Sequence, residues 1–599
     1  MNSTSINRPT YILGVYYGHN ATACLLKDGN VISIASEERF NGIKNFAGFP
    51  KKAIDYVLKE ANIASDELSF VTVSHKYGTP IHSMAKVKSG ISVKFFVLLY
   101  GPIGIIRKIW GNLAFHFKSI SSVGRIFYLF TIYTVGFITN QKEMNFLAEY
   151  LGLDRSKIIP YDHHLSHAAS AYYSSPFNDK KVLVLTLDGE GDSFCASVNI
   201  FEKDKIKIIS KTPRENSLGL LYAYLTEHLG MKSNEHEYKV MGLAPYAKDT
   251  DVLKVYENIK NIIKVDKEKL TFRSTFNTVD TEKFLHAYMH NVRFDILAGT
   301  FQKLLEDKII EWIEASIQKT GVSSLALAGG VFMNVKVNKK IAESKDVKEL
   351  FILPSCGDES SIIGSSYLAY LEECDKDRKE YSIAPIQNIY WGPQLGDREI
   401  EKDLKDFKAL RRFNIEKVED IEKETAKLLA KGAIVARVSG KMEFGARALG
   451  NRSILADPRD PDVVRIINEQ VKNRDFWMPF APSILKERAK DYIVNPKNLD
   501  SHYMMLSFDT TEKGRNDLRA AIHPSDFTVR PQIVERGFNQ KYYYLLKEFE
   551  KLTGVGGVLN TSLNLHGYPI VLGSKEALYV FKNSGLEFLT IENYLLSKK

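Results

Sequence analysis

The chain has 599 residues, of which 44 % are hydrophobic and 26 % are charged, and its formal net charge is +9. This length exceeds what one hydrophobic core supports, so we expect two or more domains of an ordinary globular protein. Its four cysteines form no CxxC pair, and the first ten residues contain no apolar signal core. These features argue against a disulfide framework, a zinc cluster and export, and they predict a cytoplasmic protein.

The positive charge is concentrated in one apolar region. No Asp or Glu occurs from Leu68 to Lys142, whereas this stretch contains nine Lys and Arg residues. Its apolar runs are shorter than the roughly 18 residues that a membrane-spanning helix needs. We expect an insertion at about 80–140 with basic amphipathic helices. It could contact the anionic inner surface of a membrane, bind an acidic or lipid-linked substrate, or cap a domain. No base-reading module is present, so a nucleic-acid partner is not expected.

Strand-like segments occur in two similar groups. The first group is predicted at Tyr11–Tyr17, Ala21–Leu26 and Val31–Ser36, and the second at Val182–Leu187 and Ser193–Ile200. Polar, glycine-rich turns join the strands of each group. This repetition predicts an α/β fold with a duplicated, actin/sugar-kinase-like domain whose turns offer backbone N–H groups to phosphate oxygens.

A pair of histidines follows the basic region in the sequence HHLSHAASAYY. His163 and His167 are four residues apart, which places both imidazoles on one face of a helix. The apolar strand behind them ends at Asp188. Two histidines and a carboxylate suit iron, manganese or zinc. The alternative is a helix that contains ordinary core histidines.

Two further strand ends contribute polar residues to the first half. The segment LALAGGVFMNVKVNKKI, residues 325–341, places Gly329 and Gly330 between a strand and a helix that we expect to start near Val331. Glycines at such a turn let a nucleotide approach the backbone. The next strand leads to Asp358, which is either a fourth metal ligand or a helix N-cap.

A charged segment at residues 372–386 is the predicted linker to a basic second half. Residues 432–485 combine glycine-rich turns with arginines and lysines that have aliphatic neighbours. Because guanidinium groups pair with phosphates, we expect these residues to line a concave anion site. The basic residues and the later polar turn residues are Arg437, Lys441, Arg447, Arg452, Arg459, Arg465, Lys472, Arg474, Arg530, Asn560, Thr561, Ser562 and Asn564.

The chain resembles the NodU/CmcH family of carbamoyltransferases over nearly its whole length. The matching blocks are HHLSHAASAYY, LDGEGD, EYKVMGLAPYAK, LALAGGVFMN, GDESSIIGSS, MEFGARALGNRSILADPRDP, MPFAPSIL and LNTSLN. The resemblance implies an actin-like transfer domain at residues 1–380, similar to enzymes that transfer threonylcarbamoyl to tRNA. It also implies a YrdC-like twisted-sheet domain at residues 381–599 that forms a carbamoyl adenylate.

The resemblance also implies the site residues. The metal ligands would be His163, His167, Asp188 and Asp358, with Fe²⁺ as the expected ion. ATP, with Mg²⁺, and carbamoyl phosphate would be the substrates, and an acceptor hydroxyl on a sugar, glycan or natural product would receive the carbamoyl group. The expected catalytic residues are His19, as general base, Lys441 and Arg447. The expected nucleotide- and substrate-binding residues are Gly189, Gly191, Lys239, Gly329, Gly330, Asn334, Arg452, Lys472, Arg474, Arg530, Asn560 and Ser562.

The chain departs from the family pattern at four positions, which are Asn20, Ala446, Met478 and Leu563. Enough arginines remain for us to expect an active enzyme. Two other functions are open at this stage, a threonylcarbamoyl-type tRNA-modifying transferase and a non-catalytic ATP-binding adaptor at a membrane surface. The sequence does not set the oligomeric state, and a homodimer is one expected form.

Overall fold

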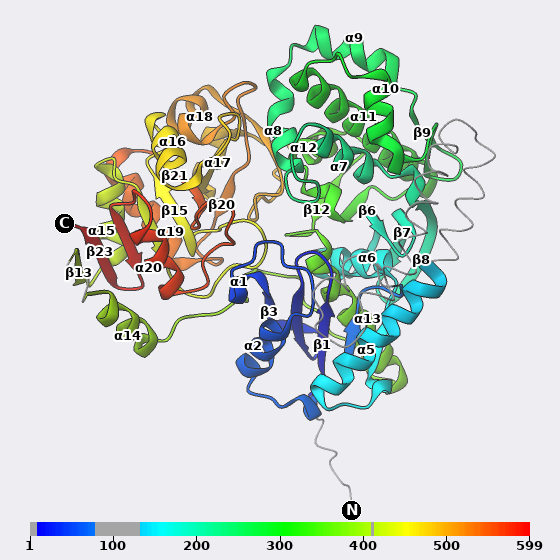
Figure 1. Cartoon of the computed structure of the whole chain (residues 1–599), viewed down its shortest axis with the longest axis horizontal. Coiled ribbons are helices and arrows are strands. Elements are labelled where there is room, and N and C mark those ends of the chain that lie inside the picture. The colour runs from blue at the N-terminus through cyan, green and yellow to red at the C-terminus, as the bar shows by residue number, and fades with distance from the viewer. Residues whose placement is uncertain (1–8, 78–131, 409–411) are drawn as a thin grey trace, which may run out of the picture.

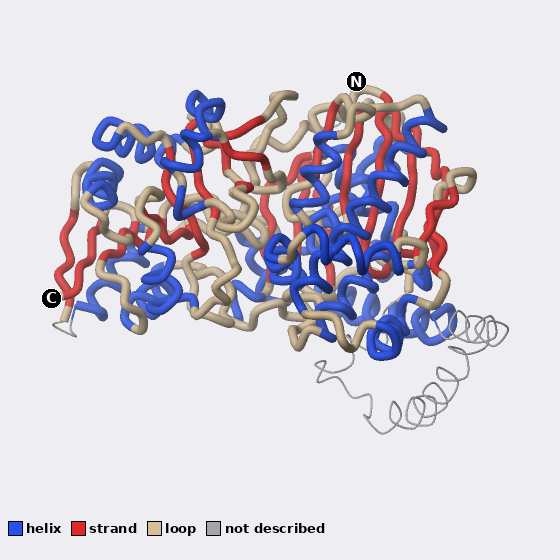
Figure 2. Tube along the Cα trace, turned by 90° about the horizontal axis from the view of Figure 1, so that it is seen from above, coloured by secondary structure: helices blue, strands red, loops and turns tan. Residues whose placement is uncertain are grey.

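The computed structural model describes residues 9–77, 132–408 and 412–599. Two α/β units lie side by side (Figures 1 and 2). The first unit ends with helix α13 (Ser361–Lys376) and the second begins with α14 (Asp397–Lys408). Between them, residues 377–396 form neither helix nor strand, whereas residues 372–376 of the predicted linker are the last turn of α13.

The first sheet of the N-terminal unit has five strands. Strand β1 pairs antiparallel with β2 and parallel with β4. In spatial order the strands are β3 (Asn30–Ser36), β2 (Thr22–Lys27), β1 (Tyr11–Tyr16), β4 (Phe70–Val73) and β5 (Ile158–Pro160). Helices α2 (Lys51–Ala61) and α5 (Phe137–Leu151) share a hydrophobic core with this sheet.

The second sheet repeats this plan. Strand β6 pairs antiparallel with β7 and parallel with β11, as β1 does with β2 and β4. The spatial order is β8 (Lys205–Pro213), β7 (Phe194–Glu202), β6 (Lys181–Gly191), β11 (Ser324–Ala328) and β12 (Glu349–Ile352). The predicted duplication is therefore present in the order and direction of the strands.

Two helices pack together between the sheets, α6 (His163–Ser174) and α13. Their close approach requires small residues, because a Cβ atom on Gly364 would lie 1.9 Å from the Ser166 carbonyl oxygen. The Ser170 hydroxyl crosses the same contact and donates to the Ser360 carbonyl oxygen at 2.9 Å. This contact brings the start of α13 beside the histidines of α6.

The remaining helices and strands of the N-terminal unit are one short helix next to β3 and a group around the second sheet. They are α1 (Glu38–Asn41), α7 (Leu218–His228), α8 (Glu237–Leu243), α9 (Asp249–Ile259), β9 (Ile263–Asp266), β10 (Thr271–Ser274), α10 (Thr281–Tyr288), α11 (Phe294–Thr320) and α12 (Val335–Glu343). The helix expected near Val331 is a short 3₁₀ turn at Gly330–Met333 followed by α12, which Asn334 caps through the amides of Lys336 and Val337.

The C-terminal unit is built on an eight-stranded mixed sheet. The spatial order is β13 (Phe413–Lys417), β23 (Tyr594–Lys598), β22 (Phe588–Ile591), β14 (Val435–Val438), β15 (Arg452–Ala456), β21 (Gly557–Ser562), β16 (Ala481–Leu485) and β20 (Gln532–Val534). A small sheet contains β17 (Ile493–Val494), β18 (Phe508–Thr510) and β19 (Thr528–Val529). The helices are α14, α15 (Ile421–Ala430), α16 (Asp462–Ile467), α17 (Ala489–Tyr492), α18 (Glu512–Asp517), α19 (Gln540–Thr553) and α20 (Ser574–Lys582).

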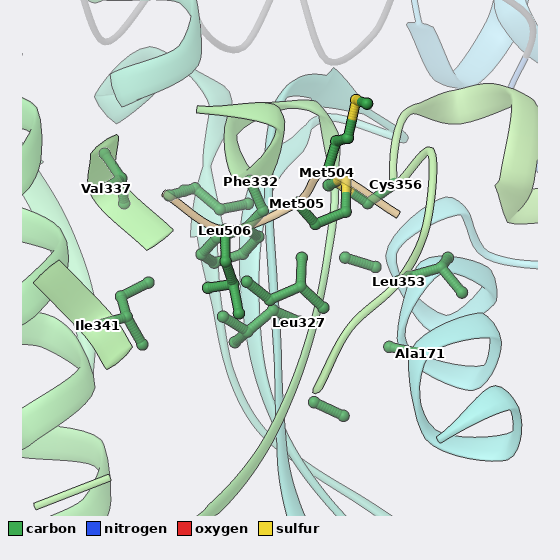
Figure 3. Close-up of a cluster of buried hydrophobic side chains, with 14 of the residues drawn as sticks. Ala171, Leu327, Phe332, Val337, Ile341, Leu353, Cys356, Met504, Met505 and Leu506 are labelled. Carbon is green, nitrogen blue, oxygen red and sulfur yellow. The ribbon is translucent and has the colours of Figure 1, made fainter. Parts of the chain in front are cut away.

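The two units share one hydrophobic core at their junction (Figure 3). Met504, Met505 and Leu506 of the C-terminal unit pack in the same cluster as Leu327 and Phe332 of the N-terminal unit. A hydrogen bond between the units reinforces this packing, because the side-chain amide of Asn338 donates to the Met505 carbonyl oxygen at 2.8 Å. The junction therefore holds the two units at a fixed distance across the cleft described below.

Most of the basic insertion expected at about 80–140 lies outside the described residues. Only its end is described, as a π-helical turn at Ile132–Gly136 and the start of α5. Among the helices that the structure describes, none combines the length and hydrophobicity that a bilayer crossing requires.

Candidate functional site

The predicted metal ligands converge where α6, β6 and α13 meet. The Nε2 atoms of His163 and His167 are 3.1 Å apart. His167 Nε2 lies 3.2 Å from Asp188 Oδ2 and 3.3 Å from Asp358 Oδ1, and one donor atom from each of the four residues fits within a 4.8 Å cluster. The structure thus brings all four residues together from positions up to 195 apart.

Glycines make room for this cluster. A Cβ atom on Gly191 would lie 1.9 Å from His163 Cδ2, so a larger residue would displace the imidazole. Gly329 has a φ of +107°, and its Cβ atom would lie 2.3 Å from the Leu187 carbonyl oxygen. Both positions therefore require glycine to keep the cluster and the adjoining strand in place, and their contact with a nucleotide stays a prediction.

Surrounding groups orient the carboxylates. The Tyr16 hydroxyl donates to Asp358 Oδ2 at 2.5 Å. The Gly189 amide donates to Asp188 Oδ1 at 2.7 Å, and the Gly330 amide donates to Asp188 Oδ2 at 3.3 Å. Such outer hydrogen bonds fix the orientation of metal ligands.

The electrostatics of the cluster favour a bound cation. Burial alone would lower the pKa of His163, but Asp358 and Asp188 raise it well above its usual range. Burial would raise the pKa of Asp358, but His163 and His167 lower it well below its usual range. Two imidazoles and two carboxylates at these separations fit a divalent ion of the iron, manganese or zinc class. The adjacent His164 points away to the Thr186 hydroxyl, and burial lowers its pKa to about 3.

A cavity of about 650 Å³ extends from this cluster to the C-terminal unit. Three half-buried arginines face it from the opposite side, Arg447, Arg474 and Arg530. Burial lowers the pKa of Arg530, and the charges of Arg447 and Arg474 lower it further. Within the described residues none of the three forms an ion pair with a carboxylate, and the Nε atoms of Arg447 and Arg530 are buried without a hydrogen-bond partner. Three unpaired cations form a site for an anion.

The loop that carries Arg447 is attached to the N-terminal unit. A guanidinium nitrogen of Arg39 donates to the Gly445 carbonyl oxygen at 2.7 Å. Gly445 has a φ of +94°, and a Cβ atom there would lie 2.5 Å from Ser355, three residues after the end of strand β12 and three before Asp358. Contacts between the two units therefore set the position of Arg447.

Residues of strand β21 form the cavity wall next to the three arginines, and this wall is called the floor. Asn560 and Ser562 line the cavity, and Asn560 Oδ1 is buried without a hydrogen-bond partner. Lys472 lies behind this floor, where its ammonium group donates to the Asn564 side chain at 2.5 Å and to both the carbonyl and hydroxyl oxygens of Ser562. It shapes the floor and does not face the cavity.

Three other predicted site residues also lie away from the cavity. Lys441 is half exposed and forms an ion pair with Glu60 at 3.0 Å. Lys239 joins the two units through Asp475 at 3.0 Å. Arg452 is fully buried and donates to five backbone carbonyl oxygens, those of Pro393, Ser439, Gly440, Asn451 and Leu572. These contacts indicate roles in holding the fold together.

Eight other predicted residues line the cavity, whereas Gly329 and His167 lie just behind its surface. The eight are His19, Gly189, Gly191, Gly330 and Asn334, together with His163, Asp188 and Asp358 of the metal cluster. The cavity also contains residues that the sequence analysis missed, notably His75 and Glu143. The only sequence signal for His75 was its position just after a strand.

Comparisons with known proteins identify the family of the chain. Residues 11–367 match the family model Carbamoyltransferase N-terminus, and residues 426–598 match Carbamoyltransferase C-terminus. An uncharacterized protein of Methanocaldococcus jannaschii is 36 % identical over 74 % of each chain. Nodulation protein NolNO of Sinorhizobium fredii is 30 % identical and covers 97 % of this chain and 79 % of its own. Nodulation protein U of Bradyrhizobium diazoefficiens is 27 % identical over 70 % of this chain and 73 % of its own. The chain belongs to the NodU-type carbamoyltransferase family and is a carbamoyltransferase.

Proposed function

We propose that the protein is an ATP-dependent carbamoyltransferase with two reaction steps in one cleft. The C-terminal unit, with a YrdC-like fold, forms carbamoyl-AMP from carbamoyl phosphate and ATP. The actin-like N-terminal unit then transfers the carbamoyl group to an acceptor hydroxyl at the metal cluster. The observation that carries this proposal is the single cavity between three unpaired arginines and the His/Asp cluster.

The arginines support the activation step. Carbamoyl phosphate and the triphosphate of ATP both supply oxyanions that Arg447, Arg474 and Arg530 can bind through charge-assisted hydrogen bonds. Atom balance requires that carbamoyl phosphate first loses phosphate to water. The resulting carbamate oxygen then attacks the α-phosphorus of ATP and displaces pyrophosphate. The guanidinium groups stabilise the negative charge that accumulates on the phosphoryl oxygens.

The metal cluster supports the transfer step. His163, His167, Asp188 and Asp358 would hold the ion, for which we propose Fe²⁺, and a bound divalent ion polarises a carbonyl oxygen as a Lewis acid. The polar segment 188–192 at the end of β6, which lines the cavity, would offer backbone N–H groups to the adenylate phosphate. An imidazole of the cavity takes the acceptor proton, and His19 is the residue that the sequence predicts for this role.

Isotope-labelled carbamoyl phosphate tests this proposal. Purified protein is incubated with ATP, Mg²⁺ and ¹³C-carbamoyl phosphate, and labelled carbamoyl-AMP is followed by mass spectrometry together with pyrophosphate. We expect both products to form in equal amounts. The proposal would be contradicted if no ¹³C appeared in carbamoyl-AMP and no pyrophosphate formed at any metal concentration.

A further inference from the structure

A further imidazole faces the cavity beside the metal cluster. His75 follows strand β4 by two residues, and its side chain is 12 % exposed. Its ring lies edge-on to Tyr16 and Tyr17, with centroid distances of 6.2 and 6.4 Å. Since the Tyr16 hydroxyl binds Asp358 at 2.5 Å, only one aromatic ring separates His75 from a metal-binding carboxylate.

A carboxylate from another element faces this imidazole. Glu143 Oε2, on helix α5, lies 3.6 Å from His75 Nε2. This oxygen is buried and, within the part of the chain that the structure describes, accepts no hydrogen bond. Glu143 therefore lies on the Nε2 side of the ring, where its carboxylate can hold the imidazole in place while the other nitrogen, Nδ1, takes a proton.

The backbone around His75 is fixed relative to the metal cluster. The Asp192 carboxylate accepts hydrogen bonds from the amides of Lys76 at 3.1 Å, Tyr77 at 3.0 Å and His163 at 2.9 Å. The Asn140 side chain donates to the His75 carbonyl oxygen at 3.2 Å. One carboxylate thus ties the chain beside His75 to the first residue of helix α6, which carries two metal ligands. Such fixed geometry is what proton transfer in a site requires.

We propose that His75 is the general base for the acceptor and that Glu143 is its positioning residue. This inference rests on the proposed function and gives His75 the role that the sequence predicted for His19. The acceptor oxygen forms a bond to the carbamoyl carbon of carbamoyl-AMP. The bond from that carbon to the phosphate oxygen breaks, and its electron pair leaves with AMP. The acceptor proton passes to His75 Nδ1 and then to solvent.

Two simple nucleophiles separate this role from a structural one. Water must lose a proton as it attacks, whereas the nitrogen of hydroxylamine attacks the carbonyl carbon before it loses one. Each variant is therefore supplied with ATP and carbamoyl phosphate, with or without hydroxylamine. Formation of AMP in the absence of hydroxylamine reports transfer to water. Formation of N-hydroxyurea above the rate measured without ATP shows that the protein is folded and still makes the adenylate, because hydroxylamine also reacts slowly with the cyanate that carbamoyl phosphate releases in water.

The variants are His75→Gln, Glu143→Gln, His19→Gln and, as a surface control, His286→Gln, whose side chain is 67 % exposed. We expect His75→Gln to slow transfer to water by about 100-fold and to leave N-hydroxyurea formation unchanged. Glu143→Gln should show the same selective loss at about 10-fold. His19→Gln should change both reactions by the same factor, and His286→Gln should change neither.

The proposal is overturned if His75→Gln slows both reactions equally or slows neither. It is also overturned if His19→Gln is the only variant that slows transfer to water and leaves N-hydroxyurea formation unchanged. These outcomes leave the proposed function intact. A wild-type protein that forms neither pyrophosphate nor N-hydroxyurea would instead remove the proposed function, and the role of His75 would fall with it.

Discussion

The two sides of the cleft differ in the kind of ligand that their charged groups can bind. The N-terminal side collects two carboxylates and two imidazoles within 4.8 Å, a set that a metal cation would stabilise. The C-terminal side presents Arg447, Arg474 and Arg530 without a carboxylate among the described residues, a set that an anion would stabilise. Burying charge without a partner destabilises a fold, so the arginine side should be less stable until an anion binds, whereas the histidines and carboxylates of the N-terminal side already pair with one another.

The largest effect should follow from removing a metal ligand. His167→Ala leaves three of the four ligand residues and opens a gap beside His163. We expect loss of the bound metal and a drop in carbamoyl transfer of about 1,000-fold, whereas pyrophosphate release should persist. Metal analysis and product assays on the same sample measure both. Retained metal with normal transfer would show that the four residues are not the metal site.

The arginine side is tested by Arg530→Met, which keeps the volume of the side chain and removes its charge. We expect KM for carbamoyl phosphate to rise by about 30-fold, equivalent to about 2 kcal/mol, because a charge-assisted contact is lost. The melting temperature of the ligand-free protein should rise, because like charges no longer meet at Arg447 and Arg474. An unchanged KM with a lower melting temperature would identify Arg530 as a structural residue.

Arg452→Met is the matched variant for a structural arginine. Its guanidinium satisfies five backbone carbonyl oxygens, which methionine cannot do. We expect the free energy of unfolding to fall by about 3 kcal/mol, opposite in sign to the effect of Arg530→Met. Denaturant unfolding measures the free energy of unfolding of both variants. Equal destabilisation by Arg452→Met and Arg530→Met would contradict the assignment of Arg452 to structure and of Arg530 to anion binding.

A smaller effect should follow from changing the contact between the two sides. Gly445→Ala combines a φ of +94° with a Cβ atom 2.5 Å from Ser355. Strain of about 2 kcal/mol should move the Arg447 loop and lower the rate of pyrophosphate release. Gly567→Ala is the control, because its φ is +78° but its Cβ atom would meet no other atom within 4 Å. Equal activity losses in the two variants would exclude a specific role for the Gly445 contact.

The smallest effect concerns Glu235, which Lys44 and Lys232 contact at the rim of the cavity. Burial would raise its pKa, but hydrogen bonds from the two lysines lower it to about 2. A lowered pKa means that the unfolded state binds the proton first, so the stabilisation is complete above the ordinary pKa of 4.5 and disappears as pH falls towards 2. Thermal unfolding should therefore show Glu235→Gln less stable than wild type at pH 7, with a difference that shrinks between pH 4.5 and pH 2. A difference that is constant with pH would contradict the ion-pair explanation.

The sequence predicted the parts of the site that depend on local spacing. His163 and His167 are one helical turn apart, Asp188 lies near the end of the apolar strand β6, and Asp358 lies beyond β12, so their meeting at one edge follows from the α/β pattern. The repeated strand groups likewise predicted the duplicated sheets.

Contacts between distant segments could not be predicted in this way. Arg452 and Arg530 are the same residue type in similar glycine-rich or turn surroundings, yet Pro393 and Leu572 supply carbonyl oxygens to only one of them. His75 acquires its carboxylate from a helix 68 residues further along the chain. No motif marks either difference, because each depends on how the chain packs in three dimensions.

The most direct test of the account is carbamoyl-phosphate-dependent release of pyrophosphate from ATP, measured for wild type, Arg447→Ala and His163→Ala. The account predicts release by wild type, its loss in Arg447→Ala, and its retention in His163→Ala, because activation and transfer use opposite sides of the cleft. Equal loss of release in both variants would contradict the assignment of the two steps to the two sides.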